Sequence, residues 1–253
     1  MDAKGSWRVH FLGTGASGGT PGQGRSARRE SSLLARHDAG TVLVDVTRQF
    51  AEQSAALGVP DGVLLTHAHR DACGGLPALD RWLARRAGGP VPVLAAPGTV
   101  AVLRDRYRRL AHCELVVVPE RRPRALGGWT VDAVVVPHAR EPNIPTYAWR
   151  LRDGEATIVY ASDVARPTAE LRRFARGATL LVVDGATWGR RIFTHLRIDA
   201  DLPELCTWPV DRIVLTQIGR SAPPHAELSR AVARLCPRAR PAYDGLVLPE
   251  RRR

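Results

Sequence analysis

Two histidines and an aspartate alternate directly after a short apolar run, in the sequence VLLTHAHRD at residues 63–71. Side chains two residues apart on an extended segment point the same way, so His67 and His69 can present neutral imidazoles to one cation, with the carboxylate of Asp71 nearby. Imidazole and carboxylate ligands suit zinc, and also manganese or iron. A motif this short equally fits a polar loop with solvated histidines, so other parts of the chain have to decide between the two.

Ligand-type side chains also follow other apolar runs, at the point where each run ends. The residues that share this placement are His67, His138, Asp163, Asp184 and Gln217. If these runs are strands of one sheet, the five side chains converge on one edge, where open sheets flanked by helices hold their sites. This regularity favours a single binding or catalytic site over polar residues scattered through the fold.

The elements that would position these side chains alternate between strands and helices. Period-two apolar patterns bounded by turn residues predict the strands, and helical spacing of apolar residues predicts the helices. After Asp184 the chain is expected to be irregular around Trp188 and His195. The predicted strands include residues 7–12, 31–35, 41–46, 129–136, 156–161, 179–183, 212–216 and 243–248, and the predicted helices include 49–57, 167–175 and 228–235.

Two further features precede the histidine motif. Residues 13–22 form a glycine-rich loop, which lets the backbone approach a site closely but lacks the pattern of a phosphate-binding P-loop. Asp45 is the one acid inside the apolar run VLVDV at residues 42–46, so its carboxylate needs a buried partner. We expect Asp45 to orient a histidine ligand from behind.

Length and composition indicate a globular chain. With 253 residues, 44% hydrophobic and 25% charged, it can bury a sizeable core, and we expect one domain over residues 1–253. It contains no run of about eighteen apolar residues, and its first residues lack the basic-then-apolar pattern of a secretion signal. A cytoplasmic protein that does not enter a membrane is therefore expected.

The four cysteines, Cys73, Cys113, Cys206 and Cys236, lie far apart in the sequence and form no C-x-x-C pair. This spacing favours buried thiols over a zinc knuckle or a disulfide framework. Cys73 follows the histidine motif directly, and we expect it to pack in the core.

The net charge of +12 comes almost wholly from arginine, since Lys4 is the single lysine. Arginine presents a fork of donors to phosphate oxygens, so the excess could attract phosphate-bearing substrates or nucleic acid. A GC-rich genome would produce the same bias without any such role. Both interpretations stay open at this point.

Several of these runs together resemble the metallo-beta-lactamase superfamily of metal-dependent hydrolases. The motifs that carry the resemblance are FLGTG at residues 11–15, TVLVD at 41–45, LTHAHRD at 65–71, the isolated His138, YASD at 160–163 and IVLTQ at 213–217. The glycine loop followed by RESS at 29–32 and the terminal YDG at 243–245 are most similar to the branch of phosphoribosyl cyclic phosphate phosphodiesterase and tRNase Z. The resemblance implies an α/β fold, a four-layered αββα sandwich. The cysteine-rich zinc insert of many cyclic phosphodiesterases and a clear tRNA-gripping arm are both absent from the sequence.

Carried over by this resemblance, His67, His69 and His138 would bind a first metal ion, with Asp163 bridging toward a second. Asp71 would belong to the second ion. Two histidines that complete the second site in the family correspond here to Ala72, which cannot bind a metal, and to Gln217, which offers a neutral amide oxygen. We therefore expect one ion per chain, zinc by preference with manganese or iron as alternatives, and regard Asp71 and Gln217 as the remnant of a second site.

The mechanism that follows from the resemblance is hydrolysis at a single metal. Zinc would lower the pKa of a bound water toward about 7 and so supply a hydroxide nucleophile. Asp71 could orient or deprotonate that water, and His195, which aligns with the general acid of the family, could protonate the leaving oxygen. His195 could equally be an ordinary loop histidine.

The expected substrate is a small-molecule or nucleotide-like phosphodiester, with nucleic acid as a further candidate, and the expected assembly is a homodimer. A lactone or thioester remains an alternative, because this fold serves many chemistries. A protein of another class is also considered, in which the cleft binds a ligand or nucleic acid without turnover, since Ala72 and Gln217 have replaced ligands.

Overall fold

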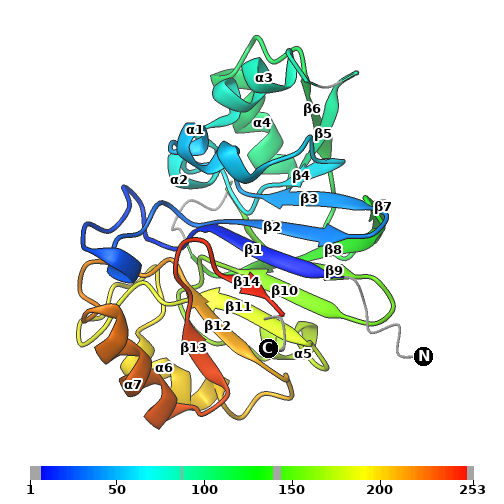
Figure 1. Ribbon diagram of the computed structural model, residues 1–253. Helices are drawn as coiled ribbons and strands as arrows, with labels where there is room; N and C mark the ends of the chain where they lie inside the picture. Colours follow the sequence, from blue (N-terminus) through cyan, green and yellow to red (C-terminus); the bar gives the residue numbers. More distant parts are fainter. Residues whose placement is uncertain (1–6, 87, 139–143, 250–253) are drawn as a thin grey trace.

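The computed structural model describes residues 7–86, 88–138 and 144–249. Two seven-stranded mixed sheets pack face to face, with helices on both outer surfaces (Figure 1). The strand orders are β14-β1-β2-β3-β4-β5-β6 in the first sheet and β13-β12-β11-β10-β9-β8-β7 in the second. This arrangement confirms the predicted four-layered αββα sandwich.

The first sheet is antiparallel from β14 to β3 and parallel from β3 to β6, and the second is antiparallel from β7 to β10 and parallel from β10 to β13. The strands of the first sheet are β1 (Arg8–Gly13), β2 (Ser32–His37), β3 (Gly40–Val44), β4 (Gly62–Leu64), β5 (Val91–Ala95), β6 (Cys113–Val117) and β14 (Val247–Leu248). Those of the second are β7 (Arg124–Leu126), β8 (Trp129–Val136), β9 (Thr146–Arg152), β10 (Thr157–Ala161), β11 (Leu180–Asp184), β12 (Ile213–Thr216) and β13 (Ala239–Pro241).

The helices divide between the two outer faces, as Figure 1 shows. The first sheet carries α1 (Phe50–Gln53), α2 (Arg70–Cys73), α3 (Leu76–Leu83) and α4 (Pro97–Arg106). The second carries α5 (Ala169–Phe174), α6 (Ile198–Leu205) and α7 (His225–Leu235). Two 3₁₀ turns, η1 (Gly24–Ser26) and η2 (Ser54–Ala56), complete the regular structure. Of the helices described, none combines the length and apolar character that a membrane crossing needs.

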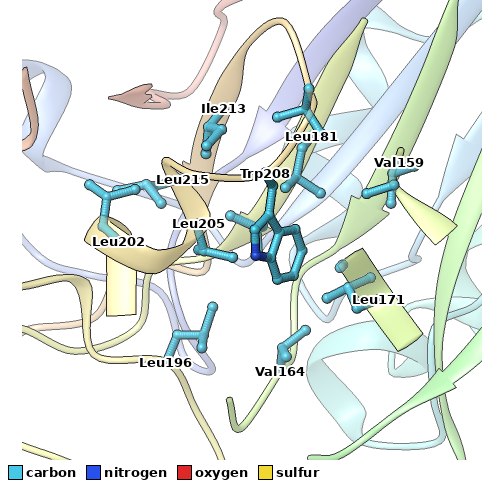
Figure 2. Close-up of a cluster of buried hydrophobic side chains, with 14 of the residues drawn as sticks. Val159, Val164, Leu171, Leu181, Leu196, Leu202, Leu205, Trp208, Ile213 and Leu215 are labelled. Atoms are coloured by element: carbon cyan, nitrogen blue, oxygen red, sulfur yellow. The ribbon is translucent and has the colours of Figure 1, made fainter. Parts of the chain in front are cut away.

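Three buried apolar clusters hold the layers together. One lies between the sheets and mixes residues of both, such as Phe11 and Trp149. A second fills the space between the first sheet and α3 and α4. The third packs α5, α6 and α7 on the second sheet, and Figure 2 shows Trp208 at its centre among leucines and valines from several elements. Burial of these aliphatic and aromatic groups is the main stabilising force for such layers.

Three of the predicted elements differ from the structure. The helix predicted at 49–57 is only α1 followed by η2. The stretch predicted as irregular after Asp184 contains α6, which the sequence hides because Pro203 lies inside the helix and no side chain caps its first turn. The last strand predicted at 243–248 is reduced to β14, because residues 243–246 form a turn in which Gly245 has φ 88°.

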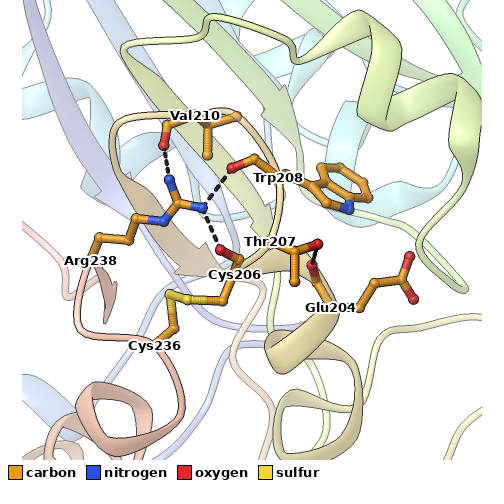
Figure 3. The surroundings of a disulfide bond; sticks show 7 residues. All are labelled: Glu204, Cys206, Thr207, Trp208, Val210, Cys236 and Arg238. Atoms are coloured by element: carbon orange, nitrogen blue, oxygen red, sulfur yellow. Dashed lines mark hydrogen bonds between the residues drawn. A yellow bond between two sulfur atoms is a disulfide. The ribbon is translucent and has the colours of Figure 1, made fainter.

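The prediction of four free thiols is wrong for two of them. Cys206 and Cys236 form a disulfide with a Cα–Cα distance of 5.6 Å, whereas Cys73 and Cys113 are free and buried as expected. The bond joins the ends of α6 and α7, and beside it Arg238 donates hydrogen bonds to three carbonyls of the connecting turn (Figure 3). Spacing could not reveal this pair, because the fold brings together cysteines 30 residues apart.

Candidate metal centre

The predicted ligand-type residues lie at one end of the sandwich, but they do not come from one sheet. The carboxyl ends of β8, β10, β11 and β12 bring His138, Asp163, Asp184 and Gln217 to the same edge of the second sheet. His67 instead follows β4 of the first sheet, on the turn that leads into α2. The cluster therefore bridges the two sheets.

Three histidines form the centre of the cluster. The ligand nitrogens of His67, His69 and His138 all lie within 4.8 Å of one another. The ring centroid of His67 is 4.6 Å from that of His69 and 5.1 Å from that of His138. Nε2 of His67 is buried and has no hydrogen-bond partner. A buried polar atom without a partner is costly, and a divalent cation at this point would satisfy it, so these residues fit a metal ion.

Hydrogen bonds behind the rings fix which nitrogen faces the cluster. Nδ1 of His67 lies 2.9 Å from the hydroxyl of Thr66, and that hydroxyl and the Thr66 amide both donate to Asp45. Nδ1 of His138 lies 2.8 Å from the carbonyl of Thr194, to which it donates. Each ring thus carries its proton on Nδ1 and turns Nε2 toward the cluster. The expected role of Asp45 is exerted through Thr66.

The surroundings of His67 favour the neutral state that a metal ligand needs. Burial lowers the pKa of His67 to about 3, so its imidazole is uncharged near neutral pH. Asp45 has the rare left-handed backbone conformation, with φ 60°, which directs its carboxylate to Thr66 at the end of the neighbouring β4.

Two carboxylates border the histidines. Asp163 is 3% exposed, and its Oδ1 lies 3.8 Å from Nε2 of His138 while Oδ2 accepts a hydrogen bond from Ser162. Oδ1 of Asp71 lies 3.9 Å from Nε2 of His67. Burial opposes ionisation of Asp163, but His67 and His138 outweigh it and lower its pKa to about 2. The pKa of Asp71 is raised by burial and by the negative charge of Asp163.

Gln217 occupies the space between these carboxylates. Its Nε2 donates to Oδ1 of Asp163 at 2.9 Å and to Oδ2 of Asp71 at 3.3 Å. This orientation is the chemically consistent one, because an amide oxygen at that position would face two acceptors. The backbone of Gln217 has φ 58° and its amide donates to the hydroxyl of Ser31. In the structure the amide nitrogen of Gln217, and not its oxygen, therefore faces the two carboxylates.

His195 is held beside the cluster by Asp184, a pairing that the sequence did not predict. Its Nδ1 lies 2.6 Å from Oδ2 of Asp184. The carboxylate of Asp184 is buried and also accepts hydrogen bonds from the backbone amides of Val164 and Ala186. Burial alone would lower the pKa of His195, but Asp184 raises it to about 9. One nitrogen of His195 lies within 4.8 Å of ligand atoms of His138 and Asp163. The sequence placed Asp184 at this edge without a partner, because the loop to His195 has no regular pattern.

A second ion pair near the cluster was also missed. Glu30 is 1% exposed, and its carboxylate accepts hydrogen bonds from the backbone amide of Gly18 and from the guanidinium of Arg48. The hydrogen bond from Arg48 to Glu30 raises the pKa of Arg48. This pair fixes the glycine-rich loop against the turn after β3. A charged residue in a loop carries no sequence signal for such a contact.

Comparison with known proteins agrees with this geometry. The family model described as a beta-lactamase superfamily domain matches residues 38–233. Ribonuclease Z of Mycobacterium tuberculosis is 31% identical over 195 residues, which cover 69% of this chain and 67% of that protein. Ribonuclease Z of Mycolicibacterium gilvum is 31% identical over 198 residues, with the same shares of 69% and 67%.

Solved structures show the same fold at lower identity. A diphosphatase from the PhnP family superposes with a TM-score of 0.83 at 24% identity, covering 96% of both chains. Zinc-bound PqqB from Methylobacterium extorquens superposes with a TM-score of 0.78 at 19% identity, covering 96% of this chain and 100% of that one. The chain therefore belongs to the beta-lactamase superfamily of metal-dependent hydrolases, in the branch that includes ribonuclease Z.

Proposed function

We propose that the protein hydrolyses a nucleotide-like phosphodiester with a single metal ion, zinc by preference. His67, His69, His138 and Asp163 would hold the ion, in agreement with the four-coordinate demand of zinc. When bound, the ion would act as a Lewis acid that lowers the pKa of a water molecule and polarises the phosphoryl oxygen. Ribonuclease Z relatives support the substrate class, including RNA.

Two side chains of the protein, Asp71 and His195, would transfer the protons of the reaction. Asp71, with its raised pKa, would accept a proton from the water that attacks phosphorus. The bond from phosphorus to the leaving oxygen then breaks, and Nε2 of His195 would donate a proton to that oxygen. Asp184 keeps His195 oriented and favours its protonated form, as a general acid requires.

The observation that carries the one-ion proposal is the position of Gln217. Its amide donates to both Asp163 and Asp71, the two carboxylates that would otherwise share a second cation. Ala72 is buried, and its side chain is a methyl group that cannot bind a cation. An amide N–H supplies partial positive charge to the carboxylates without a second ion, and so stabilises the pair in place of one.

Elemental analysis of protein purified without added metal tests this proposal. We expect about one equivalent per chain, and its loss in the His67→Ala variant. His112→Ala is the matched control, because His112 lies outside the cluster and uses only its backbone amide to contact Asp80. Two equivalents in the unaltered protein would overturn the one-ion proposal, and none after reconstitution with zinc or manganese would overturn metal-dependent catalysis here.

A substrate panel tests the reaction class. The metal-loaded protein should cleave bis-p-nitrophenyl phosphate and short RNA, whereas His67→Ala should cleave neither. If the protein hydrolyses a lactone or a thioester and no phosphodiester, the substrate is an acyl compound and the phosphodiester proposal is overturned. Binding of RNA with a steep salt dependence and no turnover of any ester would instead support a binding protein.

A further inference from the structure

A compact surface loop at residues 188–195 borders the metal centre and ends at His195. Its two ends lie side by side, because Thr187 and Arg197 form an isolated β-bridge. Inside the loop, the amide of His195 donates to the carbonyl of Ile192, which closes a turn. Compact surface loops whose ends meet are frequently functional.

The first turn of α6 holds the start of this loop in place. The amide of Gly189 donates to the carboxylate of Asp199 at 2.9 Å, and the guanidinium of Arg191 donates to that of Asp201 at 3.1 Å. These contacts, together with the bridge at its ends, give the tip of the loop a defined position beside the metal centre.

The tip of the loop presents an aromatic ring to solvent. Phe193 is 78% exposed and the neighbouring Ile192 is 42% exposed. In the part of the chain that the structure describes, Phe193 is the one aromatic residue among the exposed large hydrophobic side chains. A phenyl ring left in water forgoes the free energy of its burial. Single exposed apolar residues are common on protein surfaces, so the position of Phe193 has to carry the argument.

The two residues that follow Phe193 both contact the metal centre. The carbonyl of Thr194 accepts the hydrogen bond from Nδ1 of His138, at 2.8 Å. The ring of His195 is held by Asp184, and its centroid lies 4.9 Å from that of His138. Phe193 therefore lies on the side of the centre where His195 would protonate the leaving oxygen.

The charges of the loop suit an anionic ligand with an aromatic group. Arg190 and Arg191 precede the tip, and residues 188–195 include no acid. The aspartates that hold the loop are themselves paired, Asp201 with Arg191 and Asp199 with Arg197. An aromatic face beside arginines is the combination on which proteins stack the bases of single-stranded nucleic acids. Two exposed apolar side chains are far too small an area for a stable protein interface.

We propose that Phe193 stacks on the base of the nucleoside that leaves, so that a nucleobase on this side of the scissile phosphate is part of what the protein recognises. The inference deepens the proposed function and rests on it for the reaction. One sugar separates a nucleobase from its phosphate, and one residue separates Phe193 from His195. A base attached to the leaving oxygen through its sugar therefore falls near Phe193 when Nε2 of His195 faces that oxygen.

Fluorescence of the Phe193→Trp variant tests the stacking without turnover. The ligands are dithymidine phosphonates in which a methylene group replaces the 3′ or the 5′ bridging oxygen, so the metal-loaded protein cannot cleave them. At least one of them should quench the introduced indole in a saturable way, beyond the change seen with the six tryptophans of the unaltered protein. The same phosphonates with hydrogen in place of both thymines should not quench it.

Val59→Trp is the matched control for this measurement. Val59 is 40% exposed and precedes β4, at the strand end opposite to the one that leads to His67. Its indole should show no quenching beyond that of the unaltered protein. Equal quenching of both variants, or of neither, would overturn Phe193 as a base-binding residue.

Dinucleotides that lack one base test the same contact in the reaction. Dithymidylate is compared with its two analogues in which one thymine is replaced by hydrogen, and the products identify the nucleoside that leaves. The analogue without a base on that nucleoside should have a kcat/KM about tenfold lower than dithymidylate, as for the loss of one stacked base. The other analogue should react like dithymidylate.

Replacing the ring should remove this preference. In Phe193→Ala the tenfold ratio should fall to about one, whereas Phe193→Trp should retain it. Val59→Ala should also retain it. Melting temperatures show that each variant is folded, and a change at so exposed a position should leave them unaltered.

The outcomes separate the stacking from the reaction itself. A ratio near one in the unaltered protein, or a tenfold ratio that persists in Phe193→Ala, would overturn the stacking and leave the phosphodiesterase proposal standing. A loss that follows the base of the other nucleoside would overturn the assignment of Phe193 to the leaving side. Quenching of Phe193→Trp by the phosphonates, with no cleavage of any dinucleotide, would support base binding and overturn the proposed function.

Discussion

On one side of the metal centre, His67, His69 and His138 turn ring nitrogens toward a common point, and the nitrogen of His67 has no other partner. On the other side, Gln217 already fills the space between Asp71 and Asp163 with an amide. The first side is complete only with a cation, whereas the second is satisfied by the chain itself. On the one-ion proposal, the amide of Gln217 takes the place of a second cation beside Asp71 and Asp163.

Replacing one side chain on each side should give effects of different kinds. His138→Ala should lose the ion and lower kcat/KM by at least about a thousandfold, since Lewis-acid chemistry is lost with the metal. Asp71→Asn should keep one equivalent of metal and lose about a hundredfold in kcat, as expected for loss of a proton acceptor. Metal analysis beside steady-state kinetics measures both.

Equal loss of metal in the two variants would show that Asp71 is also a ligand, and the contrast between the sides would then disappear. His112→Ala again serves as the control, with metal content and kinetics unchanged.

Restoring the family's histidines should convert the second side into a metal site. In Ala72→His with Gln217→His, the amide is removed and two imidazoles join Asp71 and Asp163. We expect two equivalents of metal in place of one and a gain of about tenfold or more on bis-p-nitrophenyl phosphate, because paired ions stabilise both the attacking and the leaving oxygen. Each single variant should remain at one equivalent, and a double variant that also holds one would show that the backbone at these positions no longer suits a second ion.

A smaller effect on kcat is expected from Asp184, which contacts His195 beside the three histidines. Asp184→Asn retains the shape but removes the charge that orients His195 and favours its protonated form. Because the acid itself remains, kcat should fall about tenfold, less than the roughly hundredfold or greater loss expected when a general acid is removed. KM and metal content should stay unchanged. Adding Asp184→Asn to His195→Gln should cost nothing further if Asp184 acts only through His195. A further fall in the double variant would assign Asp184 a separate task.

The strands and their polar ends were readable from the sequence, because burial imposes a simple pattern. Buried strands such as β10 and β11 are short apolar runs; β11 ends at Asp184, and β10 ends two residues before Asp163. Which strand belongs to which sheet depends on pairing between strands far apart in the sequence. The sequence therefore predicts His67 on the same sheet as His138 and Asp163, whereas His67 follows a strand of the first sheet and the other two follow strands of the second.

The finer structure of the site was not readable, for physical reasons that differ between residues. The inward nitrogen of Gln217 depends on a left-handed backbone conformation that carries no composition signal in a glutamine. Asp184 contacts His195 across an irregular loop, and Cys206 and Cys236 are joined at the ends of two separate helices. Local pattern specifies elements, whereas these contacts depend on how the elements pack.

The smallest predicted effect concerns stability and arises where the amide meets the carboxylates. Gln217→Leu leaves Asp71 and Asp163 without their shared donor, and the free energy of unfolding of the metal-free protein should fall by about 1–3 kcal/mol at pH 7. The pKa of Asp71 is already raised by burial and by Asp163, and loss of the amide should raise it further.

A raised carboxyl pKa means that the folded state binds more protons than the unfolded state, so stability falls as pH rises from the unfolded pKa through the folded one. The deficit of Gln217→Leu should therefore be largest above the raised pKa of Asp71 and should shrink as the pH is lowered toward the usual carboxyl range. Urea unfolding with a chelator present, at a series of pH values, measures this difference. A deficit independent of pH would mean that Gln217 stabilises the fold by packing, and that its amide does not act on the carboxylates in place of a second cation.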